Sequence, residues 1–101
     1  MRPAVHLRLP DGRTAVLGHG DLIGRLESAA LPLADPRISE AHAMVSLRGT
    51  ELKLLALRGR FAINGRPLAE VELVPGMTTE LAKDLVLEGE QVVLPEQVPA
   101  L

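Results

Sequence analysis

The sequence predicts an all-β protein, a sandwich or barrel built from many short strands. Turn-forming residues recur about every ten positions, which is the spacing of strands in such folds. Between the turns lie short aliphatic runs, often with period two, as in strands that bury one face. At 101 residues the chain is expected to form one domain, because a second hydrophobic core would not fit.

The first half of the chain is expected to contain five strands and one long loop. Pro10-Asp11-Gly12 is a hairpin turn signal, Gly18-His19-Gly20 ends the following run, and Gly49-Thr50 forms a further turn. Residues 26–40 are irregular, and a loop of this length in a small domain is usually functional. The strands predicted here are 4–9, 13–17, 21–25, 41–48 and 51–57.

Two turn signals organise the second half. Asn64-Gly65 predicts a type I′ hairpin, since that turn needs positive φ at both positions. Pro75-Gly76 fits a type II turn, and Gly89 is expected to break one strand from the next. A helix over 80–87 is the alternative to a strand there, but the β-like neighbours favour the strand.

The apolar residues that recur in these runs are candidates for the core. Residues 1–95 are predicted to form the domain, and 96–101, with their proline, a tail or linker. The predicted core residues are Leu7, Leu9, Val16, Ile23, Val45, Leu47, Leu54, Ile63, Leu73, Leu81, Val86 and Val93.

The composition excludes several classes of function. A net charge of −2 gives no support for binding nucleic acid or a membrane surface, and Phe61 is the only aromatic residue available for base stacking. The absence of cysteine excludes disulfides, thiol catalysis and cysteine-ligated zinc. No nucleophile-elbow or phosphate-loop motif occurs, so neither an enzyme nor a cofactor is expected. A cytoplasmic location is expected, since no apolar run is long enough to span a membrane and no signal peptide is recognisable.

Four motifs carry a resemblance to a known family. They are Ile23-Gly24-Arg25; Leu33-Ala34-Asp35 followed by Ile38-Ser39-Glu40-Ala41-His42-Ala43; Phe61-Ala62-Ile63-Asn64-Gly65; and Leu73-Val74-Pro75-Gly76. Their order and spacing over residues 5–94 resemble the forkhead-associated (FHA) domain, in a divergent form. The preference for arginine over lysine would suit a bacterial member with a G+C-rich genome. The resemblance implies a β-sandwich of about eleven strands whose loops at one end bind phosphothreonine peptides.

The resemblance assigns roles to individual residues. Arg25, at a strand end after Gly24, and Ser39, in the long loop, are expected to contact the phosphate, and bidentate phosphate contacts suit arginine. Gly24 and His42 are expected to support the site, with the imidazole bonding loop backbone. Asn64 aligns with an asparagine of the family's site, although a type I′ turn residue is the simpler interpretation.

Two departures from the family pattern bear on this function. Glu40 stands where the family has arginine or lysine, and Gly59 where it has the asparagine that grips the peptide backbone. Arg58, Arg60 and Arg37 would supply compensating charge if they converge on Arg25.

Two functions therefore stay open from the sequence. One is a phosphothreonine-peptide-binding module in signalling or transcriptional regulation. The other is a degenerate FHA-fold scaffold that binds an unphosphorylated partner or a neighbouring domain of its own protein. A salt bridge from Glu40 to Arg25 would favour the scaffold, and convergence of the other arginines would favour the module.

Overall fold

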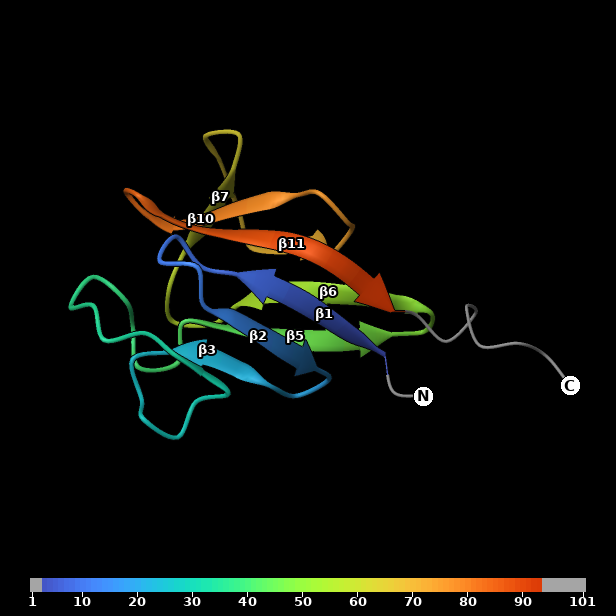
Figure 1. Ribbon diagram of the computed structural model, residues 1–101, viewed down its shortest axis with the longest axis horizontal. Helices are drawn as coiled ribbons and strands as arrows, with labels where there is room; N and C mark the ends of the chain where they lie inside the picture. The colour runs from blue at the N-terminus through green and yellow to red at the C-terminus, as the bar shows by residue number, and fades with distance from the viewer. Residues whose placement is uncertain (1–2, 94–101) are drawn as a thin grey trace, which may run out of the picture.

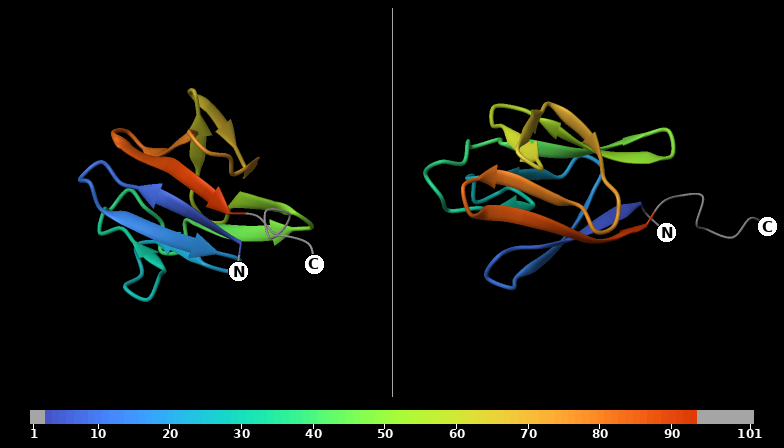
Figure 2. Two further views of the ribbon diagram at one scale, coloured as in Figure 1. Left: turned by 45° about the vertical axis from the view of Figure 1, so that its right-hand side comes forward. Right: turned by 90° about the horizontal axis from the view of Figure 1, so that it is seen from above.

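The computed structural model describes residues 3–93 and confirms the predicted all-β class. These residues form eleven strands and no helix, arranged as two packed sheets (Figures 1 and 2). Residues 3–93 contain no helix that is long and apolar enough to cross a membrane. The predicted domain end at 95 and the tail 96–101 lie outside the described residues.

Each sheet is predominantly antiparallel, and only β3 and β4 pair in parallel. The six-stranded sheet has the order β2 (Thr14–Gly18), β1 (Ala4–Arg8), β11 (Leu85–Val93), β10 (Thr78–Ala82), β7 (Phe61–Ile63) and β8 (Arg66–Leu68). The five-stranded sheet has the order β4 (Leu31–Pro32), β3 (Leu22–Gly24), β5 (Ala43–Arg48), β6 (Glu51–Ala56) and β9 (Glu70–Glu72).

The first and last strands lie side by side. Ala4 at the start of β1 pairs with Val93 at the end of β11. The long loops on either side of β4, and the loop between β6 and β7, gather at the opposite end of the sandwich (Figure 1). The end that carries the predicted recognition loops is therefore separated from the end where the described chain begins and finishes.

The predicted turns form with the backbone geometry that their residues allow. Asn64 and Gly65 both have positive φ, at 51° and 77°, and join β7 to β8. Gly76 has a φ of 84°, as the third position of a type II turn requires. The segment 80–87, for which a helix was the alternative, is a hairpin of β10 and β11 with Asp84 at its turn.

Two features differ from the sequence prediction. Gly89 does not break a strand, because β11 runs through it to Val93. His6 pairs with Gln91 and Leu7 with Gly89, so Glu90 is an extra residue in a β-bulge, which keeps the strand continuous. The stretch 26–40 is also not wholly irregular, since it contains the short strand β4.

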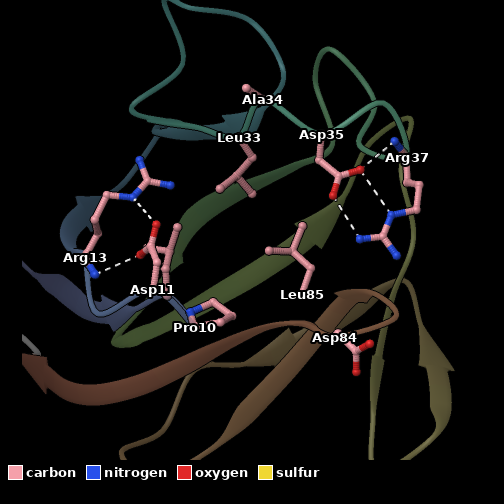
Figure 3. A pocket seen from close by; sticks show the side chains of 10 residues that line it. Pro10, Asp11, Arg13, Leu33, Ala34, Asp35, Arg37, Asp84 and Leu85 are labelled. Atoms are coloured by element: carbon pink, nitrogen blue, oxygen red, sulfur yellow. Dashed lines mark hydrogen bonds and ion pairs between the residues drawn. The ribbon is translucent and has the colours of Figure 1, made fainter.

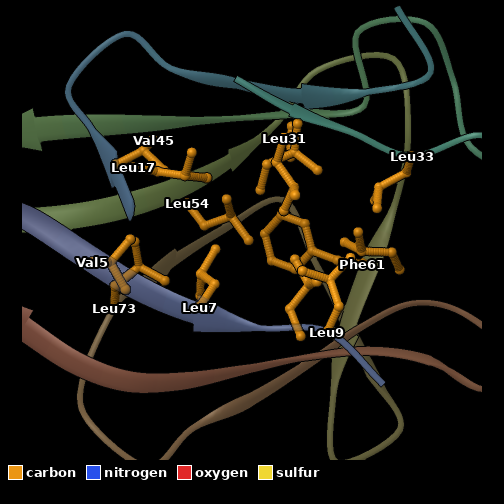
Figure 4. Packing of buried hydrophobic residues seen from close by; sticks show 14 of the residues in the cluster. Val5, Leu7, Leu9, Leu17, Leu31, Leu33, Val45, Leu54, Phe61 and Leu73 are labelled. Atoms are coloured by element: carbon orange, nitrogen blue, oxygen red, sulfur yellow. The ribbon is translucent and has the colours of Figure 1, made fainter. Parts of the chain in front are cut away.

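The core lies between the sheets and is almost entirely aliphatic, with Phe61 packed among leucines (Figure 4). Of the predicted core residues, seven are buried and four are half-buried. Val16 was assigned wrongly: its side chain is 58% exposed, and its neighbour Leu17 points inward instead. In the apolar run Ala15-Val16-Leu17 the sequence alone does not fix which alternate residues face the core. Buried residues absent from the prediction are Val5, Leu17, Leu31, Leu33, Ile38, Ala43, Leu52, Phe61, Leu87 and Val92, with Ala29 beside them.

Candidate functional site

Gly24 lets the loop that follows β4 come against the end of β3. It is buried, and a Cβ at this position would overlap the backbone carbonyl of Glu40. The approach is fixed by a hydrogen bond from the Arg25 amide to the Ser39 carbonyl at 3.0 Å. Any larger residue than glycine would push Ser39 and Glu40 away from Arg25.

Arg25 extends from this junction into solvent. Its Nε donates to the Ile38 carbonyl at 3.0 Å, which ties the guanidinium to the same loop. The Nη2 atom lies 4.0 Å from Oε1 of Glu40, and both side chains are largely exposed, at 47% and 66%. The guanidinium is thus held to the loop by its Nε, while its Nη2 lies at ion-pair distance from the exposed Glu40 carboxylate.

His42 holds the loops together from within. The side chain is buried, and its Nδ1 accepts from the Ser39 amide at 3.1 Å. Because an amide can only donate, Nδ1 carries no proton, and Nε2 donates to the Arg60 carbonyl at 2.6 Å. One neutral imidazole therefore connects the loop before β5 to the loop before β7.

Gly59 completes this contact. A Cβ at position 59 would lie within the imidazole ring of His42. The Gly59 amide also donates to the His42 carbonyl at 3.2 Å. The packing of His42 therefore explains why position 59 is glycine. The comparison with the family's asparagine did not reveal this reason.

The other arginines are divided between two settings. Arg58 and Arg60 are exposed on the loop that contacts His42. Arg37 is fully engaged: Nε and Nη2 donate to the Asp35 carboxylate at 3.1 and 2.9 Å, and Nη1 donates to the Lys83 carbonyl at 2.9 Å. Convergence of Arg37 on Arg25 was left open by the sequence, and the contacts of Arg37 are instead with Asp35 and Lys83.

The Asp35–Arg37 pair lowers the pKa of the Asp35 carboxyl group markedly. The Arg37 side chain, and then its amide, donate to Asp35 and hold the pKa of Asp35 at about 2, below the ordinary 3.8. The pair lines a hollow of about 270 Å³, into which Leu33 and Leu85 also point (Figure 3). The bond to Lys83 joins this loop to the β10–β11 turn on the other wall of the hollow.

The role of Asp35 was missed by the sequence analysis, although a signal was present. The same Asp-x-Arg spacing occurs at Asp11 and Arg13, where the aspartate likewise accepts from the arginine amide and from its Nε. An aspartate two residues before an arginine in a tight turn can accept both groups at once.

The structure brings most of the predicted site residues together. The contacts above connect five of them: Gly24, Arg25, Ser39, His42 and Arg60. Arg58 is adjacent, because its backbone amide donates a hydrogen bond to the Ala41 carbonyl at 3.1 Å. Asn64 belongs to the β7–β8 turn, which projects at the top of Figure 1, and within residues 3–93 no hydrogen bond joins it to the other predicted site residues. Its observed role is that of a turn residue.

Several solved structures with the same fold are described as FHA domains. A structure described as an analysis of phosphothreonine-dependent FHA domain interactions is 29% identical, with a TM-score of 0.75 over 87% of this chain and 96% of that one. The FHA domain of FhaA, solved with the intracellular domain of Rv3910, is 29% identical, with a TM-score of 0.73 over 83% and 97%. The FHA domain of CT664 from Chlamydia trachomatis shares the fold at 17% identity, with a TM-score of 0.73 over 89% and 99%.

The sequence itself matches no family model and no curated protein. The structural similarity nevertheless extends over more than four fifths of the chain in each of these comparisons. The chain has the FHA fold, and the resemblance predicted from its motifs is confirmed at this level.

Proposed function

We propose that this FHA-fold chain is a protein-interaction module that binds phosphothreonine-containing peptides through Arg25 and Ser39. The observation that carries the proposal is the setting of Arg25. Its Nε is anchored to the Ile38 carbonyl, its amide donates to the Ser39 carbonyl, and its side chain is 47% exposed to solvent. Similarity to a structure described as phosphothreonine-dependent supports the same function.

The chemistry of this arrangement suits a phosphate group. A guanidinium offers several N–H donors in one plane, and phosphate oxygens accept them in pairs. Because Nε is already bonded to the loop, the side chain loses little further freedom when a ligand binds. The Ser39 hydroxyl, next to this position, supplies a further donor.

Glu40 opposes the phosphate but does not block it. Its separation of 4.0 Å from Arg25 and the exposure of both side chains make this ion pair weak, on the scale of roughly 0–1 kcal/mol for surface pairs. A dianionic phosphate would compete well for the guanidinium, and the flexible glutamate can turn into solvent. Arg58 and Arg60, exposed on the neighbouring loop, add positive charge to the same end.

The second candidate is a scaffold that binds without phosphorylation. Two observations favour it: Gly59 offers no side chain to hold a peptide backbone, and Arg37 already bonds the Asp35 carboxylate and the Lys83 carbonyl. In that case Arg25 only pairs with Glu40 and bonds the Ile38 carbonyl of the loop. The partner is then an unphosphorylated protein or a neighbouring domain. No catalytic step is part of either proposal, and a cytoplasmic location stays a prediction from the sequence.

Calorimetric titration of a phosphothreonine peptide library and its unphosphorylated copy tests the proposal. We expect binding of the phosphorylated form only, weakened roughly ten- to a hundredfold by Arg25→Ala, since each lost charge-assisted bond contributes about 1.5–3 kcal/mol. Arg25→Lys should recover part of the affinity, because an ammonium lacks the planar fork. Added salt should weaken wild-type binding.

Arg66→Ala is a matched control, because Arg66 is an exposed arginine on β8. It should bind like the wild type, and the melting temperature should stay unchanged in all three variants. Equal, weak heats for both peptide libraries with wild type and Arg25→Ala would reject phosphate recognition. Equal, strong heats with both libraries would instead establish the scaffold.

A further inference from the structure

Three of the four edge strands of the sandwich are protected against pairing with another chain. β4 has two residues and ends on Pro32, β8 carries Pro67 at its centre, and β9 carries Glu70 and Glu72. Short length, proline and charge are the devices by which natural sheets avoid edge-to-edge association. The remaining edge, β2, has none of these.

β2 is a regular and uncharged edge strand. Its five residues, Thr14 to Gly18, contain no proline and pair with β1 in unbroken register. At its centre Val16 exposes 58% of its surface on the outer face of the sheet. A β-branched side chain in this position favours contact with a further strand.

Within residues 3–93, the main chain of β2 also has no partner strand along this edge. The Leu9 amide donates to the Arg13 carbonyl at 2.8 Å, which makes these two residues a hydrogen-bonded pair of the β1–β2 hairpin. In an antiparallel ladder such pairs alternate, so the amides and carbonyls of Thr14 and Val16 point away from β1. Gly18 ends the free stretch, because its amide donates to Asp21 Oδ2 at 2.8 Å and its carbonyl accepts from the Asp21 amide.

We propose that β2 pairs antiparallel with β2 of a second copy of this chain, around a two-fold axis at Ala15. This register places Thr14 of each copy opposite Val16 of the other. The two free amides and two free carbonyls of each copy then form four inter-strand hydrogen bonds, and each Val16 packs beside a threonine methyl group. The two six-stranded sheets become one continuous sheet.

A second copy is favoured over an unrelated partner because the edge is complementary to itself. The free main-chain groups occur on two residues spaced by two, which is the set that a two-fold axis at Ala15 satisfies completely. No charged residue lies within the paired segment, so no like charges are brought opposite one another. The segment is short, and its interface falls below the roughly 800 Å² per partner of a standard stable complex. The expected dimer is therefore weak and depends on concentration.

Sedimentation velocity on the full chain over a concentration series tests this proposal. The weight-average mass of the wild type should rise from monomer toward dimer. Val16→Lys restores the charge that protects other edges and should weaken the association at least tenfold. Val74→Lys is the matched control, because Val74 is an exposed valine, at 44%, outside every strand. It should associate like the wild type.

Hydrogen exchange on the wild type provides a measurement that needs no variant. The amides of Thr14 and Val16 should become more protected as the concentration rises, while the exposed amides of the β5–β6 turn should not change. A wild type that remains monomeric at the highest concentration would overturn the proposal. Association that is unchanged in Val16→Lys would also overturn it. So would protection of the Thr14 and Val16 amides that appears only when an aliphatic peptide is added and not when the protein concentration is raised. The phosphopeptide titrations are independent of these results.

Discussion

At the scale of single residues, the recognition end depends on one buried imidazole and the glycine against it. His42 satisfies the Ser39 amide and the Arg60 carbonyl, which belong to different loops. Gly59 leaves the space that the ring fills. The position of the loop beside Arg25 is therefore determined by residues that are not expected to touch a ligand.

The first prediction is that Gly59→Ala destabilises the fold by about 1–3 kcal/mol, as overpacking of a filled site does. The ring cannot move aside without losing a hydrogen bond at each nitrogen. Urea unfolding followed by far-UV circular dichroism measures the change. Gly89→Ala is the control, since a Cβ there meets Met77 at an ordinary 3.4 Å.

A second prediction concerns His42→Ala, which leaves the Ser39 amide and the Arg60 carbonyl without a partner. We expect a loss of about 1–3 kcal/mol in the free energy of unfolding. Gly59→Ala should then cost much less in the His42→Ala background, because the ring that it would strike is gone. A double-mutant cycle measures this coupling, and additive effects would contradict the packing described here.

Residue chemistry was predictable from the sequence where it depended on a motif. The structural role of His42 and the turn at Asn64 were both expected, because the residue types are specific to those tasks. The reason for Gly59 was not predictable, since it depends on a ring that lies far away in the sequence. The engagement of Arg37 with Lys83 was hidden for the same reason, as a backbone carbonyl has no sequence signature.

At the scale of elements, the loop before β5 is held at two places. His42 holds its end, and Arg37 joins its middle to the β10–β11 turn through the Lys83 carbonyl. Asp35 orients Arg37 by accepting from its side chain and its amide. A long loop without regular structure is in this way held in place at two points.

The third prediction follows from the lowered pKa of Asp35. In the folded chain its pKa is about 2, against an ordinary value of about 3.9 in an unfolded chain. The unfolded state therefore takes up the proton first as the pH falls. The stabilisation by this carboxylate is fully present above pH of about 4 and is lost as the pH falls through about 2.

Urea midpoints measured between these pH values test the sign. The wild type should lose stability relative to Asp35→Asn as the pH is lowered, because the variant has no carboxylate at position 35 to protonate. Asp84→Asn, on the other wall of the hollow, is the control and should follow the wild type. A constant difference between wild type and Asp35→Asn at every pH would show that the Arg37 pairing does not stabilise the fold.

Elements with local signals were predicted well, and those with non-local causes were not. Asn64-Gly65 and Pro75-Gly76 specify their turns through their own φ preferences, and both turns formed. The continuity of β11 through Gly89 depends on a bulge against β1, more than eighty residues earlier in the chain. The inward face of β2 likewise depends on its register with β1, which the run Ala15-Val16-Leu17 leaves undetermined.

At the scale of the whole molecule, the first and last strands of the described residues pair inside the six-stranded sheet. β1 and β11 are adjacent in the sheet although they are the first and last strands in sequence. Pairing of such distant segments requires most of the chain to be ordered first, and the entropy of closing the loop delays it. The FHA fold of this chain should therefore form slowly for its size.

The fourth prediction is refolding on the millisecond-to-second scale typical of all-β domains with non-local pairing. Stopped-flow far-UV circular dichroism after dilution from urea measures it, because the chain has no tryptophan for fluorescence. Refolding in microseconds would contradict the expectation that pairing of β1 with β11 slows folding.

Ala substitution of Leu54, buried in the core, should lower stability by about 2–5 kcal/mol and serves as a reference for a full core contact.

The pairing of Ala4 with Val93 has one further consequence, for how the molecule can be held. A tether fixed at either end of the described chain, or at both, would hold the sandwich at the end away from the loops on either side of β4 (Figure 1). A bead, a sensor surface or a fused carrier attached there leaves the recognition loops pointing outward. Under the proposed peptide-binding function, swapping the attachment between these two ends should leave peptide capture unchanged.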